Sequence, residues 1–172
     1  MMTRVSGIIS VIAAIPPLSF TTVAAMAAPA VYNAHLSGNE QVPARATHAT
    51  GQAIFKLNAD RTELQFRINV SNIENVVSAR LHLAPAGQTG PEIAVLFGPV
   101  APGGGKSAGT LVTGALAATN LTGDMAGKTL ADLAAEIEAG RVYVNIATDD
   151  GVGQPDEKPG DFSAGEIRGQ IR

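Results

Sequence analysis

Residues 62–70 read TELQFRINV, a stretch in which polar and apolar side chains alternate without a break. Apolar residues occupy every second position from Leu64 to Val70, and polar residues occupy the positions between them. Because successive side chains of a β-strand point to opposite faces, this pattern predicts a strand with one face on a core and the other in water. Such half-buried strands are typical of antiparallel sheets.

The residues just before this stretch predict its first neighbour in the sheet. Residues 52–58 place Ala53, Phe55 and Leu57 on one side, which is again the period of a strand. The link from Asn58 to Arg61 also contains Ala and Asp, and Asn and Asp are common in tight turns. The two stretches are therefore expected to form an antiparallel hairpin.

Six further stretches have strand-like patterns and are separated by loops rich in glycine and proline. They are residues 31–36, 77–83, 92–97, 107–112, 141–147 and 166–171. Many short strands between such loops predict an all-β antiparallel sandwich or barrel. One short helix is expected at residues 129–138, because Thr129 and Asp132 have the spacing of a capping box and Gly140 follows the last turn. This helix is expected to close one end of the sandwich.

Composition limits the classes of function. The chain has 172 residues with 12 basic and 15 acidic side chains, a formal net charge of −3 and no cysteine. No cluster of Lys or Arg is present, so nucleic acid is not expected as a partner. Without disulfides the protein must be stabilised by its core, and its length suits one such domain.

The amino terminus has the order of segments found in secretory signal peptides. Residue Arg4 precedes an apolar stretch, and small residues including Ala27 and Ala30 follow. Pro16 and Pro17 interrupt the apolar stretch, which argues against a permanent membrane anchor. We therefore expect a signal peptide at residues 1–27, cleavage after Ala27 or Ala30, a single domain at 31–172, and a secreted or periplasmic location.

Four segments resemble motifs of the CHRD (chordin) domain family, in its stand-alone microbial exported form. HLSGNEQVP at 35–43 is similar to the family's LSGxxEVP, and RLHLAPAG at 80–87 to its HIHxGPAG. AGRVYVNI at 139–146 and GEIRGQI at 165–171 resemble the closing motifs GxxYVNVHT and GEIRGQI. The resemblance covers nearly all of the predicted mature chain. It implies an immunoglobulin-like or superoxide-dismutase-like β-sandwich, usually with no assigned enzymatic activity.

The chain departs from the family pattern at two histidines. Arg80 stands where the family has the first His of HIH, and Ala147 stands where it has the His of YVNVHT. The segment 149–164 is also longer than the family usually has before its final strand. If those histidines bind metal in relatives, this chain has lost most of the set.

Two groups of residues are candidates for metal binding. The only histidines are His35, His48 and His82, which could contribute to a copper or zinc site or could be ordinary surface histidines. The loop after residue 148 carries five carboxylates, which could bind calcium or form a solvated acidic loop. These carboxylates are Asp149, Asp150, Asp156, Glu157 and Asp161.

A polar cluster is expected where the last two predicted strands lie side by side. Glu166 and Arg168 share one face of the final strand, and Tyr143 and Asn145 share one face of the strand before it. The cluster could be an ion pair with hydrogen bonds that fixes strand register, or a face that recognises a ligand. The residues considered for ligand binding are Arg80, His82, Tyr143, Asn145, Glu166 and Arg168.

No motif of nucleophilic catalysis is present, and no catalytic residue is assigned. The leading hypothesis is an exported, non-catalytic module with no resident cofactor that binds an extracellular or envelope protein or polymer. The alternatives are a copper-, zinc- or calcium-binding protein, a dismutase-like metalloenzyme, and a structural protein of the matrix or envelope.

Overall fold

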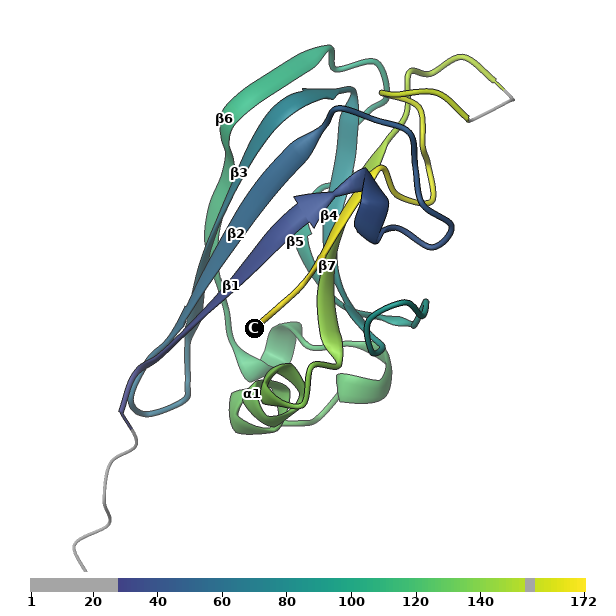
Figure 1. Cartoon of the computed structure of the whole chain (residues 1–172). Helices are drawn as coiled ribbons and strands as arrows, with labels where there is room; N and C mark the ends of the chain where they lie inside the picture. Colours follow the sequence, from purple (N-terminus) through teal and green to yellow (C-terminus); the bar gives the residue numbers. More distant parts are fainter. Residues whose placement is uncertain (1–27, 154–156) are drawn as a thin grey trace, which may run out of the picture.

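The computed structural model describes residues 28–153 and 157–172, and within them the chain forms eight strands and one α-helix (Figure 1). The signal peptide expected at 1–27 lies outside the described residues. The strands are β1 (Ala30–Ser37), β2 (Thr50–Leu57), β3 (Leu64–Glu74), β4 (Val76–Leu83), β5 (Glu92–Phe97), β6 (Lys106–Leu116), β7 (Val142–Thr148) and β8 (Ile167–Gln170). The helix is α1 (Leu130–Glu138), and the 3-10 turns are η1 (Gly38–Glu40), η2 (Ala118–Asn120) and η3 (Gly123–Met125).

All strand pairs are antiparallel, in the order β5-β4-β7-β8-β1-β2-β3-β6. The sheet curves so that β6-β3-β2-β1 forms one layer and β8-β7-β4-β5 the other, with the apolar side chains between them (Figure 1). The layers are joined through β1 and β8, whose strand pairing consists of Ser37 opposite Arg168, with backbone hydrogen bonds between Asn33 and Arg172 beyond it. The structure confirms the predicted all-β antiparallel sandwich, and its two layers belong to one continuous, nearly closed sheet.

The hairpin that the alternating stretch predicts is β2–β3. Phe55 lies opposite Phe66 across the ladder, and their rings are 6.3 Å apart within the core. The side-chain oxygen of Asn58 accepts hydrogen bonds from the backbone N–H groups of Thr62 and Glu63, at 2.8 and 3.1 Å. Asn58 therefore stabilises the connecting turn, in agreement with the turn predicted at residues 58–61.

The junction between the layers depends on a glycine. A Cβ atom placed on Gly169 would lie 2.0 Å from the carbonyl oxygen of His35. The backbones of β8 and β1 can therefore approach each other only because this residue has no side chain.

The helix has the predicted boundaries. The hydroxyl of Thr129 accepts a hydrogen bond from the Asp132 N–H at 3.1 Å, and the Asp132 carboxylate accepts one from the Thr129 N–H at 2.8 Å. Gly140 has a φ of 69°, the left-handed conformation that ends many helices. Leu130, Leu133, Ala134 and Ile137 are buried, so α1 covers one end of the sandwich (Figure 1).

β6 is longer than the predicted strand 107–112, extending from Lys106 to Leu116. Its pairing with β3 shifts register between Ile68 and Asn69, and again between Val70 and Ile73. Both shifts lie opposite residues 107–112, and the unpredicted residues 113–116 pair regularly with β3. Their sequence, TGAL, has small residues where an alternating pattern needs large apolar ones, so it gives no strand signal. In the part of the chain that the structure describes, no helix is both long and apolar enough to cross a membrane.

Candidate functional site

Three of the predicted ligand-binding residues form a stack on the outer side of β4, β7 and β8. The His82 and Tyr143 rings are nearly parallel, with centroids 5.1 Å apart. The Arg168 guanidinium carbon lies 3.4 Å from the centroid of the Tyr143 ring, a cation–π contact. Tyr143 and Arg168 are buried, with 4% and 2% of their surface exposed, so this stack is not open to a large ligand.

The stack holds the loop between β4 and β5 by its backbone. Arg168 donates to the carbonyl oxygens of Gln88 and Pro85, at 2.7 and 3.3 Å. The Tyr143 hydroxyl accepts from the Gly90 N–H at 3.2 Å, and His82 Nδ1 lies 2.9 Å from the Gly90 carbonyl oxygen. These bonds join exposed and half-exposed loop residues to side chains of β4, β7 and β8. The stack therefore holds the loop of residues 84–90 against the sheet.

Glu166 belongs to a different network from Arg168. Its fully buried carboxylate accepts hydrogen bonds from the Thr47 hydroxyl, the Thr148 hydroxyl and the Gly160 N–H, at 2.5, 2.8 and 2.9 Å. Glu166 and Arg168 form no ion pair among the described residues, so the interpretation of the cluster as an ion pair is not supported. Glu166 instead joins the loop before β2 to the loop before β8, and the three donors give its buried carboxyl oxygens hydrogen-bond partners.

The other two predicted ligand-binding residues also bind within the molecule. Arg80 forms an ion pair with Glu92 on the neighbouring strand β5. The Asn145 side chain accepts a hydrogen bond from Gln41 at 2.7 Å and donates one to the Ala164 carbonyl oxygen at 3.0 Å. All six predicted residues thus hold strands or loops together.

The three histidines are not brought together. His35 is exposed on β1, His48 is exposed in the loop before β2, and His82 is half-buried in the stack. Nδ1 of His82 bonds Gly90, and Nε2 is buried without a partner among the described residues. Burial lowers the pKa of His82, because desolvation disfavours the charged imidazolium.

The acidic loop does bring carboxylates together. Oxygens of Asp149, Asp150 and Asp161 lie within 4.8 Å of one another, the one such group of acids or histidines among the described residues. Lys158 already donates to Asp150 at 2.7 Å, and this ammonium lowers the pKa of that carboxyl. Glu157 is exposed and in no such group, and Asp156 lies outside the described residues.

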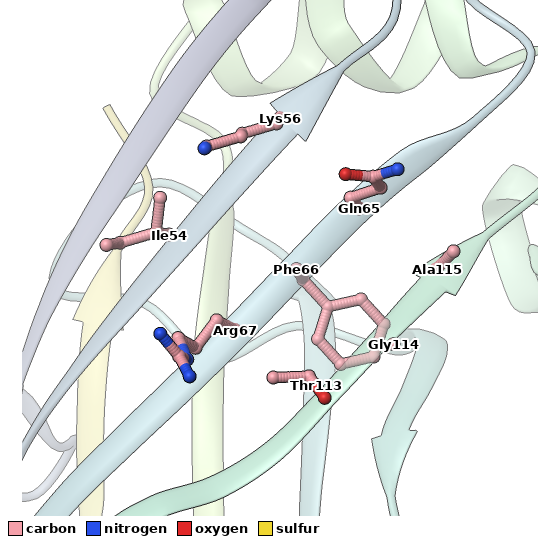
Figure 2. Close-up of a pocket in the computed structure, with 8 residues that line it drawn as sticks. All are labelled: Ile54, Lys56, Gln65, Phe66, Arg67, Thr113, Gly114 and Ala115. Carbon is pink, nitrogen blue, oxygen red and sulfur yellow. The ribbon is translucent and has the colours of Figure 1, made fainter.

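Sequence reasoning missed the outer face of β2, β3 and β6. A shallow groove of about 490 Å³ runs over these strands (Figure 2). Its lining residues are Ile54, Lys56, Gln65, Phe66, Arg67, Thr113, Gly114 and Ala115. The polar positions of the alternating stretch, Gln65 and Arg67, were the available signal, but the sequence alone could not show that β6 lies beside them.

The groove carries two cations that form no ion pair with any described residue, and the nearby acid Glu63 accepts a hydrogen bond from the lining residue Gln65 at 2.7 Å. The side chains of Lys56 and Arg67 are exposed, and neither forms a side-chain hydrogen bond or ion pair within the described residues. The four strands of this layer contain one acidic residue, Glu74, and it pairs with Lys106 at 3.6 Å. An exposed face with two unpaired cations, on a protein of net charge −3, is suited to an acidic ligand. We call this surface, lined by the eight residues above, the cationic groove.

Comparison with known proteins gives one family. The family model described as CHRD domain matches residues 32–155, which is most of the chain. No curated protein and no solved structure matches.

Proposed function

The chain belongs to the CHRD domain family, and we propose that it is an exported, non-catalytic module that binds a partner of the periplasm or the cell exterior through the cationic groove. One observation carries the choice of surface. Lys56 and Arg67 flank a groove on an exposed sheet face and have no partner among the described residues. The predicted polar cluster, by contrast, is occupied in holding loops.

A binding experiment with matched variants tests the surface. The mature protein is immobilised and challenged with solubilised cell-envelope material, alongside the double variant Lys56→Glu/Arg67→Glu. We expect the double variant to lose about tenfold in retained material, since reversing charge repels an acidic partner. Lys128→Glu, an exposed cation near α1, is the control and retains the wild-type amount. Equal retention by all three proteins contradicts the proposal.

Export is supported by the order of segments at the amino terminus and by where the described domain begins. Ala30 is the first residue of β1 and pairs with Leu57. Cleavage after Ala27 leaves this pair whole, and cleavage after Ala30 removes it. We therefore propose Ala27, and amino-terminal sequencing of the exported protein should begin at Ala28. Uncleaved protein confined to the cytoplasm contradicts export.

A second candidate function is calcium binding by Asp149, Asp150 and Asp161. Three carboxylates within 4.8 Å favour it, because calcium prefers oxygen ligands in loops. Lys158 opposes it, because its ammonium already neutralises Asp150. Millimolar calcium should raise the melting temperature relative to chelator if an ion binds, and an unchanged melting temperature removes this candidate.

Copper or zinc binding and dismutase activity are weaker alternatives. They need several ligands on one ion, and the three histidines lie in no common group within the described residues. Protein incubated with copper and zinc should show no superoxide consumption above that of the buffer and should retain no stoichiometric metal after dialysis. Stoichiometric copper with activity would replace the proposed function.

A further inference from the structure

We infer that the partner bound at the cationic groove is an acidic peptide segment, which adds to the free edge of β6 as an extra antiparallel strand. The inference rests on the proposed function, because it uses the same surface, and it adds the chemical class of the partner and the way it binds.

β6 is an edge strand. In the described residues it pairs with β3 on one side and with no strand on the other. In an antiparallel strand alternate residues direct their N–H and C=O groups away from the neighbour, so the outer edge of β6 offers unpaired backbone donors and acceptors. An added peptide strand is the ligand that satisfies such a row.

One part of this edge is regular enough to pair. The segment Val112–Leu116 continues opposite Leu64–Ile68 without a register shift, whereas the ladder is irregular on the other side of Val112. Irregularities of this kind twist an edge and discourage pairing. The usable edge is therefore the half of β6 that lines the cationic groove (Figure 2).

The side chains along this half leave room for a neighbour. Thr113, Gly114 and Ala115 are small and exposed, and none carries a charge. The Phe66 ring lies against Gly114, where an added Cβ would come 2.7 Å from the ring (Figure 2). The Phe66 ring thus covers Gly114 and compensates for its missing side chain, which would otherwise weaken the strand, while the edge itself carries no bulky side chain at this position.

Charge selects the kind of peptide. Gln65 and Ala115 lie in register with Lys56, and Thr113 lies in register with Arg67, so both cations are within two strands of the free edge. Alternate side chains of an added strand would point over the same face, where carboxylates can reach these cations. A second copy of the chain is not complementary here, because it brings the same two cations and no unpaired carboxylate on these strands.

The probe is a fluorescent peptide of alternating valine and glutamate, about six residues long, which suffices to span the regular edge at about 3.3 Å per residue. Its binding to the mature protein is followed by anisotropy and by hydrogen exchange. We expect saturable binding, new protection of the outward-directed amides among residues 112–116, and about a tenfold loss of affinity in Lys56→Glu/Arg67→Glu but not in Lys128→Glu. A peptide methylated on alternate backbone nitrogens keeps its charge but cannot pair, and it should bind at least about tenfold more weakly.

The outcomes separate this inference from the proposed function. Equal binding of the methylated peptide, protection confined to other strands, or self-association of the protein through β6 each overturns strand addition. None of these affects the envelope-binding result, which depends only on the cationic groove. Loss of groove dependence in the envelope experiment overturns the proposed function itself.

Discussion

Replacement of Arg168 by methionine is the most direct test of whether the stack of His82, Tyr143 and Arg168 holds the loop 84–90 in place. Arg168 is 2% exposed, donates to the carbonyl oxygens of Gln88 and Pro85, and lies against the ring of Tyr143. Methionine keeps most of the volume and fills the space beside the ring, but it cannot donate a hydrogen bond. The change therefore removes the bonds that hold the loop 84–90 and leaves the apolar packing largely in place.

The expected loss follows from the contacts. A hydrogen bond from a charged group contributes about 1.5–3 kcal/mol, and a buried cation–π contact about 2 kcal/mol. Burial of the guanidinium offsets part of this gain, as the lowered pKa of Arg168 indicates, since desolvation disfavours the charged form. Water can also reach carbonyls on a released loop. We therefore expect a net loss of about 3 kcal/mol in the free energy of unfolding, and about 10 °C in melting temperature.

Denaturant unfolding and hydrogen exchange together measure this effect. The unfolding midpoint should fall, and amides near residues 84–90 should lose protection more than those of the β2–β3 hairpin. Arg67→Met is the matched control, because Arg67 is exposed and has no partner in the described chain, so its change should stay within about 0.5 kcal/mol. A loss of less than about 0.5 kcal/mol for Arg168→Met would refute the reasoning.

Three further predictions concern single residues. Gly169→Ala should lower the free energy of unfolding by more than about 3 kcal/mol, measured by denaturant titration, because its Cβ would lie 2.0 Å from a carbonyl oxygen of β1. A near-wild-type unfolding midpoint would show that β8 and β1 do not need a glycine at this position. The pKa of His82 is lowered in the folded state, so the unfolded chain binds more protons than the folded chain just below about pH 6.5. The free energy of unfolding should therefore rise with pH from the lowered pKa to about pH 6.5 and then level off. His82→Gln should flatten this slope in a series of melts, and an unchanged slope would assign it to other groups. Thr129→Ala should cost about 1 kcal/mol in thermal melts by removing the cap of α1, whereas Thr129→Ser should be nearly neutral.

The strands were predictable because their signal is local. In β3 the side chains of Leu64, Phe66 and Ile68 alternate with exposed or half-exposed ones, and the burial follows that order. The helix was predictable for a similar reason, since the cap at Thr129 and the glycine at 140 act within one turn of the chain. Each of these features needs only a few neighbouring residues to be recognised.

The site was harder to predict because its partners are distant in the sequence. The parity of the last predicted strand placed Glu166 and Arg168 on one face, whereas β8 begins at Ile167, after Glu166. It could not show that Thr47 would hydrogen-bond Glu166 while Arg168 donates to the backbone of Gln88, which puts the two side chains in separate networks. The groove was missed for the same reason, since it forms only where β6 lies beside β3. The paired residues Phe66 and Gly114 are 48 positions apart in the sequence.

The positions that carry the family resemblance and the positions proposed to bind are different sets. The motif residues His82, Tyr143, Arg168 and Gly169 fasten a loop and join the two layers. Lys56 and Arg67 lie outside all four motifs, on the solvent face of strands whose opposite face forms the core. Because alternate positions of a strand can change without disturbing the core, such a face can acquire a ligand while the motifs preserve the fold. Membership of the family therefore accounts for the scaffold, and the proposed binding depends on Lys56 and Arg67, which the family motifs do not include.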